Sequence, residues 1–381
     1  MKSYNHIFEQ IIDPDNLRVA IDRSSLGKRD RSDVRRVREN PEPHIEIIRN
    51  YLINRTYKIP DHDFVVINDG IRQKKRTIIK PNYRYEQIIH HAIVQAMKPV
   101  FMCGMYRYSC GSIPDRGAHF GKKYIEKFIR ENPGEVKYCF KMDIRHFFQS
   151  INQTILKDKF RKTIHDDNAL WLLELMIDAY SDHEENDVKY GLPLGYYTSQ
   201  WFSNWYLQGL DHYIKENLGA KCFVRYMDDI IIFGRNKKEL HNMKDKIAHY
   251  LKTELDLEIK SNWQVFRFDY VSRKDGKRKG RFLDFMGFRF YRDRTTLRKS
   301  IMLKGTRKAR AISKKDKATW FDACQMISYL GWFRSVDAYG VYEKYIRDRI
   351  NVKSLKQKVS RKGARYGNQL QECRRVYDTK T

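Results

Sequence analysis

The residues best placed to do chemistry are two adjacent aspartates in the middle of the chain. Residues 226–229 read Tyr-Met-Asp-Asp, and apolar segments flank this tetrad at 223–226 and 230–233. Two apolar runs separated by a short polar tip predict a β-hairpin. Asp is common in solvated turns, but two adjacent carboxylates between such apolar strands repel each other unless a cation neutralises them. The pattern therefore favours a metal site.

A metal site for phosphoryl transfer needs a further carboxylate, and Asp143 provides one. It ends the apolar segment 138–143, which predicts a strand. Two magnesium ions bridged by Asp143 and Asp228 would activate an attacking hydroxyl and stabilise a leaving pyrophosphate. Asp229 would then be a weaker ligand. The pair Asp166-Asp167, by contrast, precedes a helical run and is interpreted as a helix cap.

The charge of the chain indicates its class of partner. Lys and Arg number 75 among 381 residues against 47 Asp and Glu, which gives a net charge of +28. Such an excess predicts a polyanionic partner, of which nucleic acid is the commonest, with an anionic membrane as the rival. No apolar run is long enough to span a bilayer and no signal peptide is evident, so no membrane is expected. Charge alone does not indicate an activity.

The elements that must position these carboxylates follow from periodicity. The pattern predicts helices at both ends of the chain and strands between them. The expected elements are a charged helical region over the first ~60 residues, strands at 64–71 and 74–81, a helix at 85–100, a hairpin at 284–290 and basic helices from about 306. The segment 353–381 is interpreted as a phosphate-binding arm or a solubilising tail. Six cysteines without zinc-ligand spacing are interpreted as reduced thiols of a cytoplasmic protein.

Four motifs in order resemble the successive palm motifs of reverse transcriptases, which are RNA-directed DNA polymerases. They are 143–148, 191–195 (Gly-Leu-Pro-Leu-Gly), the tetrad 226–229 and 285–288 (Phe-Met-Gly-Phe). The resemblance extends from about residue 15 to about residue 350. It implies an α+β, right-hand polymerase fold with fingers, a palm of antiparallel sheet and packed helices, and a helical thumb.

The same resemblance implies domain boundaries and cofactors. Fingers are expected at 1–137 with part of the helical region 152–190, the palm at 138–292, and the thumb with the basic tail at 293–381. The implied cofactor is Mg²⁺, as two ions, with Mn²⁺ as a substitute. The implied metal and catalytic residues are Asp143, Asp228 and Asp229, with Ile144 also in the metal set.

The resemblance also assigns individual binding roles. Phe148 matches the steric gate, where a bulky ring collides with a ribose 2′-hydroxyl and selects deoxynucleotides; the alternative is a core aromatic, which suits the neighbouring Phe147 better. Arg76 resembles the fingers residue that grips the triphosphate, although in so basic a chain a single Arg is often only a surface residue. The remaining assignments are Lys75, Leu194, Gly195 and Lys260 for nucleotide binding, and Phe285, Met286 and Gly287 for the primer grip.

One departure from the wider family narrows the resemblance. Many retroviral and group II intron enzymes have Gln at the position of Leu194, whereas the pattern at 194–200 (Leu-Gly-x-x-x-Ser-Gln) is similar to reverse transcriptases of bacterial diversity-generating retroelements and related defence-associated enzymes. Segments 16–20, 111–117 and 328–332 fit that group as well. In the mutagenic retroelements an aliphatic residue here is associated with loose base choice opposite adenine.

The predicted function is RNA-directed copying of a dedicated template RNA into cDNA, error-prone as in diversity-generating retroelements. The implied partners are a template or non-coding RNA, a DNA or RNA primer, deoxynucleotide triphosphates, and an accessory protein or further copies of the chain. An antiphage defence enzyme that makes repetitive or untemplated DNA shares every motif. An RNA-dependent RNA polymerase shares the carboxylates, but Phe148 argues against it. A non-catalytic RNA-binding protein is the remaining alternative.

Overall fold

The computed structural model describes residues 4–69 and 74–361. The chain folds as two units: Met1–Ile125 with Asn132–Phe266, and Glu126–Glu131 with Arg267–Thr381. The boundary after Phe266 falls inside the region predicted as palm, and the first unit holds the regions predicted as fingers and most of the palm. The threefold division into fingers, palm and thumb stays a prediction.

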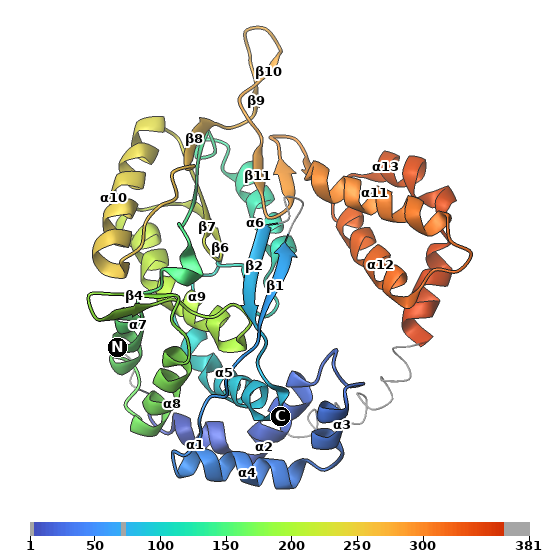
Figure 1. The fold of residues 1–381 in the computed structure, drawn as a ribbon. Coiled ribbons are helices and arrows are strands. Elements are labelled where there is room, and N and C mark those ends of the chain that lie inside the picture. Colours follow the sequence, from blue (N-terminus) through green and yellow to red (C-terminus); the bar gives the residue numbers. More distant parts are fainter. Residues whose placement is uncertain (1–3, 70–73, 362–381) are drawn as a thin grey trace. The chain divides into compact units, whose positions relative to one another are not determined.

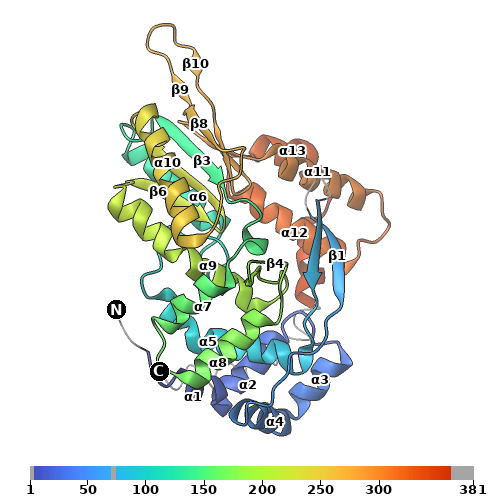
Figure 2. The same ribbon diagram turned by 60° about the vertical axis from the view of Figure 1, so that its left-hand side comes forward.

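A four-stranded sheet forms the centre of the first unit. Its strand order is β6 (Cys222–Tyr226), β7 (Asp229–Gly234), β3 (Tyr138–Asp143) and β8 (Gln264–Arg267). β7 pairs antiparallel with both β6 and β3. The predicted strands around the tetrad are confirmed, with one difference: Asp229 already belongs to β7. Helix α10 (Lys237–Leu255) packs against β3 and β7 (Figure 2).

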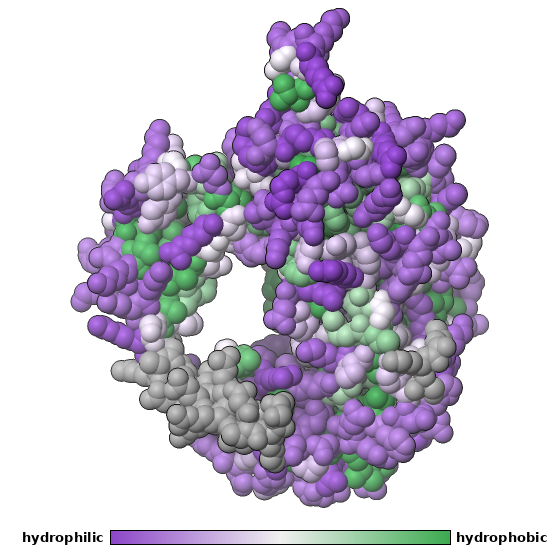
Figure 3. Space-filling model, turned by 180° about the vertical axis from the view of Figure 1, so that it is seen from behind, coloured by the Kyte–Doolittle hydropathy of each residue, from purple (hydrophilic) through white to green (hydrophobic). Residues whose placement is uncertain are grey.

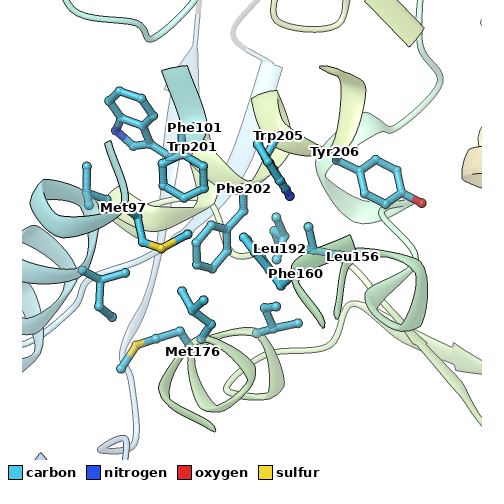
Figure 4. Packing of buried hydrophobic residues seen from close by; sticks show 14 of the residues in the cluster. Met97, Phe101, Leu156, Phe160, Met176, Leu192, Trp201, Phe202, Trp205 and Tyr206 are labelled. Atoms are coloured by element: carbon cyan, nitrogen blue, oxygen red, sulfur yellow. The ribbon is translucent and has the colours of Figure 1, made fainter. Parts of the chain in front are cut away.

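Four helices that bury apolar side chains build the core beside this sheet. They are α5 (Ile88–Met102), α7 (Gln153–Arg161), α8 (Asp167–Asp178) and α9 (Tyr197–His212). Phe101, Phe160, Phe202 and Trp205 stack or meet edge to face with centroids 5.1–6.3 Å apart (Figure 4). The predicted cap is confirmed, because the Asp166 carboxylate accepts from the Ala169 N–H at the start of α8.

The amino-terminal part of this unit is helical, as predicted, and leads into a hairpin (Figure 1). Its elements are α1 (Ile7–Ile12), α2 (Pro14–Ser24), α3 (Ser32–Glu39), α4 (Pro41–Ile53), β1 (Phe64–Asp69) and β2 (Lys74–Ile79). The two predicted strands are confirmed as one antiparallel pair. The side chains of β1 are largely exposed, 60% for Phe64 and 59% for Val66. The hairpin therefore gains little from burial, and its base must hold it in place.

Short elements connect these parts of the first unit. They are the π-turn η1 (Tyr83–Gln87), the 3₁₀-turn η2 (Phe147–Gln149), the hairpin β4 (His183–Glu185) and β5 (Val188–Tyr190), and the π-turn η3 (Tyr213–Asn217). The helix predicted at 85–100 is present, but its regular part begins three residues later at Ile88. Helix α6 (Ala118–Glu131) belongs partly to each unit.

The second unit combines two small sheets with helices. Its elements are β9 (Tyr270–Val271), β10 (Arg278–Lys279), β11 (Leu283–Phe285), β12 (Phe288–Phe290), β13 (Thr295–Leu297), α11 (Lys299–Ser313), α12 (Trp320–Arg334), α13 (Tyr339–Tyr345) and η4 (Arg347–Arg349). The predicted hairpin at 284–290 is confirmed as β11 and β12. Asp322 and Thr319 form a capping box on α12, and Lys308 and Lys315 bind the same carboxylate. Most of the predicted basic tail at 353–381 lies outside the described residues.

The surface is consistent with the composition. The face drawn in Figure 3 is mainly hydrophilic. Within the described ranges, no helix has the length and apolarity needed to cross a membrane.

Truncation at the aromatic cluster tests this core. We expect Phe160→Ala to lower the free energy of unfolding by about 3–5 kcal/mol, because Phe160 is fully buried and its loss leaves a cavity among three aromatic rings. Denaturant unfolding measures the change. The matched control is Phe64→Ala, which removes an exposed ring and should change stability by less than about 0.5 kcal/mol.

Candidate active site

The sheet brings the three predicted carboxylates to one end. Asp143 ends β3 and lies directly opposite Asp229 in the antiparallel register of β7. Asp228 occupies the two-residue turn between β6 and β7, where Met227 has a left-handed φ of 55°. A two-residue loop between strands requires such positive φ values, so the turn geometry fixes where Asp228 projects. The structure thus brings the three predicted carboxylates together, and their catalytic role stays a prediction.

The electrostatics of the site show how close these groups lie. Burial, followed by the charge of Asp143 and a hydrogen bond with it, raises the pKa of Asp228 to about 7, and Asp229 contributes in the same direction. A carboxyl group with a pKa this high is still partly protonated at neutral pH, and a bound cation would displace that proton. The site therefore stores repulsion that binding of a positive charge relieves.

Lys260 provides a cation next to this site. Its Nζ lies 3.2 Å from Oδ2 of Asp143, and its backbone N–H donates to the Asp143 carbonyl at 2.9 Å. Ile144 forms an isolated bridge with Ile259, which fixes the strand end next to Lys260. Lys260, predicted to bind the nucleotide, thus lies beside Asp143, and its binding role stays a prediction. Because its side chain is 44% exposed, the ammonium group can also reach a ligand in solvent.

A buried ion pair between Arg225 and Asp211 stabilises the turn that carries Asp228. Arg225 is fully buried in β6 and donates from Nε and Nη2 to both oxygens of Asp211, at 2.7 and 2.6 Å. Its Nη1 donates to the Met227 carbonyl at 3.1 Å and to Asn204 Oδ1 at 2.9 Å. The Ser109 hydroxyl completes the set by donating to Asp211. The bond to the Met227 carbonyl fixes the turn next to Asp228. In the sequence, a charged residue inside an otherwise apolar strand was the only indication of these bonds.

Close packing at Gly111 fixes the turn from the other side. A Cβ at this position would lie 2.5 Å from Met227 Cγ and 2.7 Å from the Met227 backbone nitrogen. The Gly111 carbonyl accepts from the Asn204 amide at 3.0 Å. Only glycine at position 111 allows the segment 111–117 to pack so closely against the Tyr-Met-Asp-Asp tetrad at 226–229.

The loop at 191–196 links the nucleotide-binding residues that the sequence predicted. The Leu192 N–H donates to the Phe148 carbonyl at 2.7 Å, and the Ile79 N–H at the end of β2 donates to the Leu194 carbonyl at 2.7 Å. Gly195 has a φ of 120°, and a Cβ there would lie 2.0 Å from the Ile79 carbonyl oxygen. Phe148, Leu194 and β2 are therefore held in one connected arrangement. Phe148 itself is half-buried, whereas Phe147 is in the core.

The remaining predicted residues are placed as follows. Arg76 is exposed on β2, three residues before Ile79. Lys75 lies on the same strand, but its side chain is outside the described part. Met286 and Gly287 form the tight turn of the β11–β12 hairpin in the second unit, and Phe285 is the last residue of β11. There a Cβ at Gly287 would lie 2.7 Å from Ile301 Cδ1, so the turn is packed against α11.

The donor set suits a hard divalent cation. Carboxylate oxygens are the ligands that Mg²⁺ and Mn²⁺ prefer, and burial next to Asp143 raises the pKa of Asp228, which a bound cation would lower again. Among residues 4–69 and 74–361, no group of three or more His, Cys, Asp or Glu side chains is arranged as a preformed metal cage. Mg²⁺ does not require one, because it keeps several waters and often uses one or two carboxylates.

A comparison with known families decides the assignment. A model of the family "Reverse transcriptase (RNA-dependent DNA polymerase)" matches residues 59–290. The chain belongs to the reverse transcriptase family. The match covers more than half of the chain and includes every predicted site residue. The chain therefore carries the domain of an RNA-directed DNA polymerase, a nucleotidyltransferase, and the predicted right-hand polymerase fold is confirmed.

The solved structures similar to this reverse transcriptase are remote relatives. A telomerase from Candida albicans, in complex with a telomeric RNA fragment, has 12% identity and a TM-score of 0.43 over 76% of this chain and 55% of its own. A Candida tropicalis telomerase has 12% identity and a TM-score of 0.45 over 85% and 57%. The chain thus spans a little over half of the length of these telomerase chains. No curated protein matches the sequence.

The raised pKa of Asp228 gives a pH-dependent stability. The folded chain keeps the Asp228 proton up to pH about 7, whereas the unfolded chain loses it near the ordinary value of 3.8, so stability falls as pH rises through this window. In EDTA, we expect Asp228→Asn to raise the melting temperature at pH 8 and to leave it nearly unchanged at pH 4. Differential scanning fluorimetry measures both. An equal loss of stability at the two pH values would contradict the repulsion inferred for this site.

Proposed function

We propose that this reverse transcriptase copies a dedicated RNA template into complementary DNA, with Asp143, Asp228 and Asp229 as its catalytic carboxylates. The observation that carries the proposal is the convergence of these three carboxylates on one end of a buried sheet, with the pKa of Asp228 raised. Crowding of carboxylates destabilises the folded state, but it also creates a site that attracts divalent cations.

The carboxylates bind the metal ions, with Ile144 beside them in the metal set. Two bound Mg²⁺ ions, or Mn²⁺ in their place, supply activation of the primer hydroxyl and stabilisation of the leaving pyrophosphate. Lys260, held against Asp143, places a positive charge where phosphate oxygens collect. Arg225 and Gly111 keep the turn that carries Asp228 in one conformation. The protein thus contributes mainly position and charge, as nucleotidyl transfer requires.

The nucleotide-binding surface is proposed to lie along the loop at 191–196 and β2. Arg76 and Lys75 would grip the triphosphate, and Leu194 with Gly195 would border the nascent base pair. Phe148 would act as the steric gate; its position is fixed through the bond from Leu192 to its carbonyl. Phe285, Met286 and Gly287 would form the primer grip, because a tight turn with a glycine lets a backbone approach nucleic acid closely.

The partners follow from charge and chemistry. A net charge of +28 favours a polyanion, here a template RNA with a DNA or RNA primer. More specifically, the enzyme would copy a dedicated template with loose base choice opposite adenine. Leu194 supports this proposal, because its side chain cannot donate or accept hydrogen bonds as Gln can. A bacterial diversity-generating retroelement and an antiphage defence system would use the same residues, and they differ in their products.

Sequencing of the products tests the carboxylates. The wild-type chain is expected to yield DNA complementary to one co-purifying RNA, and Asp228→Ala/Asp229→Ala is expected to yield none, because the metal ligands are lost. The matched control is Asp166→Ala/Asp167→Ala, an adjacent acidic pair that caps α8; it should lower stability by about 1 kcal/mol and retain synthesis. Repetitive or untemplated DNA from the wild type would favour the defence role. The same product from the Asp228 and Asp229 variant would refute the site.

A second substitution tests fidelity. We expect Leu194→Gln to lower the error frequency at template adenines by about tenfold, which corresponds to ~1.4 kcal/mol of discrimination from one hydrogen-bonding side chain. Leu194→Met keeps an apolar side chain of similar volume and should leave the errors unchanged. Error rates are counted by sequencing cDNA from an adenine-rich template. An accurate wild-type enzyme, or equal error spectra for both variants, would count against error-prone copying.

A further inference from the structure

A buried carboxylate lies at the base of the β1–β2 hairpin, outside the catalytic centre. Glu86 is fully buried in the π-turn η1, and its Oε1 lies 2.5 Å from Nε2 of His62. Its Oε2 accepts the backbone N–H of Asn82 at 2.8 Å. Burial alone would raise the pKa of Glu86, but the nearby His90, whose Nε2 lies 3.9 Å from Oε1, together with Tyr196 and the Asn82 N–H outweighs burial and lowers the pKa. The group is therefore ionised at neutral pH.

The contacts of Glu86 join the two ends of the hairpin. His62 lies two residues before β1 begins at Phe64, and Asn82 lies three residues after β2 ends at Ile79. One carboxylate thus bonds to both the entering and the leaving chain. Because the side chains of β1 are exposed, few contacts along the hairpin itself hold it in position. The bonds at its base must do so.

The same cluster reaches the loop that carries Leu194. The Tyr196 hydroxyl lies 3.1 Å from Nε2 of His62, and the Thr198 hydroxyl lies 2.9 Å from Nδ1 of His90. Tyr196 directly follows Gly195, which packs against the Ile79 carbonyl, and Thr198 lies at the start of α9. Glu86 is therefore connected to this loop through its hydrogen bond with His62 and the hydrogen bond between His62 and Tyr196.

A buried, hydrogen-bonded carboxylate of this kind seldom adds stability over an apolar replacement, but it does fix one arrangement. We propose that Glu86 is a positioning residue, which locks the base of the β1–β2 hairpin to the loop at 191–196 and thereby sets the spacing between Arg76 and Leu194 around an incoming nucleotide. The inference rests on the polymerase activity of the family. It assigns Glu86 no contact with substrate.

The test compares Glu86→Gln and Tyr196→Phe with the wild type on oligo(dT)-primed poly(rA) with dTTP. Both variants keep the side-chain shape and remove part of the link. We expect each to raise KM for dTTP about tenfold while kcat changes less than about twofold, because a misplacement far from the chemistry weakens nucleotide binding. The double variant should match the more severe single variant, because both changes break the same connection.

Hydrogen exchange gives a readout that is independent of activity. The Ile79 amide donates to Leu194, and we expect its exchange to quicken in both variants. The control is Asp166→Ala, which weakens a helix cap in the same unit and should change neither KM nor exchange at Ile79. If Glu86→Gln does not fold, Tyr196→Phe carries the test alone.

The outcomes are distinguishable. Unchanged KM and unchanged exchange in a folded, active variant would overturn the positioning role, as would a loss of kcat without a change in KM. A wild-type protein inactive on every primed template would instead contradict the proposed function, and the exchange result would still decide the role of Glu86.

Discussion

Repulsion among three carboxylates is the constraint around which the first unit is organised. Asp143 and Asp229 face each other across a strand pair, and Asp228 follows from the adjoining turn. Without a cation the cheapest state is one in which Asp228 keeps a proton. A fold can tolerate such a site only if the backbone beneath it cannot relax. The buried strands β6, β7 and β3 meet that condition, since their side chains are locked into the core on both faces.

Charged residues that carry no chemistry of their own supply the remaining rigidity. Arg225 and Asp211 neutralise each other in the interior, and the remaining donor of Arg225 bonds to the turn. Glu86, with His62 and His90 beside it, has a similar role at the base of the β1–β2 hairpin. An ion pair between Arg225 and Asp211, and hydrogen bonds around Glu86, take the place of apolar packing at these two positions and link separate segments of the chain. Buried polar groups of this kind favour one geometry over its neighbours, which a site for nucleotide selection requires.

The sequence predicted those features that local patterns encode. Apolar strands around the acidic tetrad, the cap at Asp166 and the hairpin at 284–290 depend on neighbours in sequence, and all three are present. The packing of Gly111 against Met227 and the reach of Glu86 to His62 depend on tertiary contacts between distant segments. The periodicity of apolar residues in the sequence does not predict such contacts. Arg225 is an intermediate case, because a charge inside an apolar strand signals a buried partner without naming Asp211.

The exposed hairpin has a consequence for the behaviour of the protein outside its complex. β1 presents four consecutive apolar residues, Phe64 to Ile67, and a two-stranded ribbon leaves a backbone edge open on each strand. Such an edge is a template for adding a strand from another molecule. The basic residues of β2 and the large positive charge of the chain keep copies apart at low ionic strength. Salt screens this charge and so weakens the repulsion between copies of the chain. Ionic strength that weakens binding to RNA therefore also favours self-association of the isolated chain.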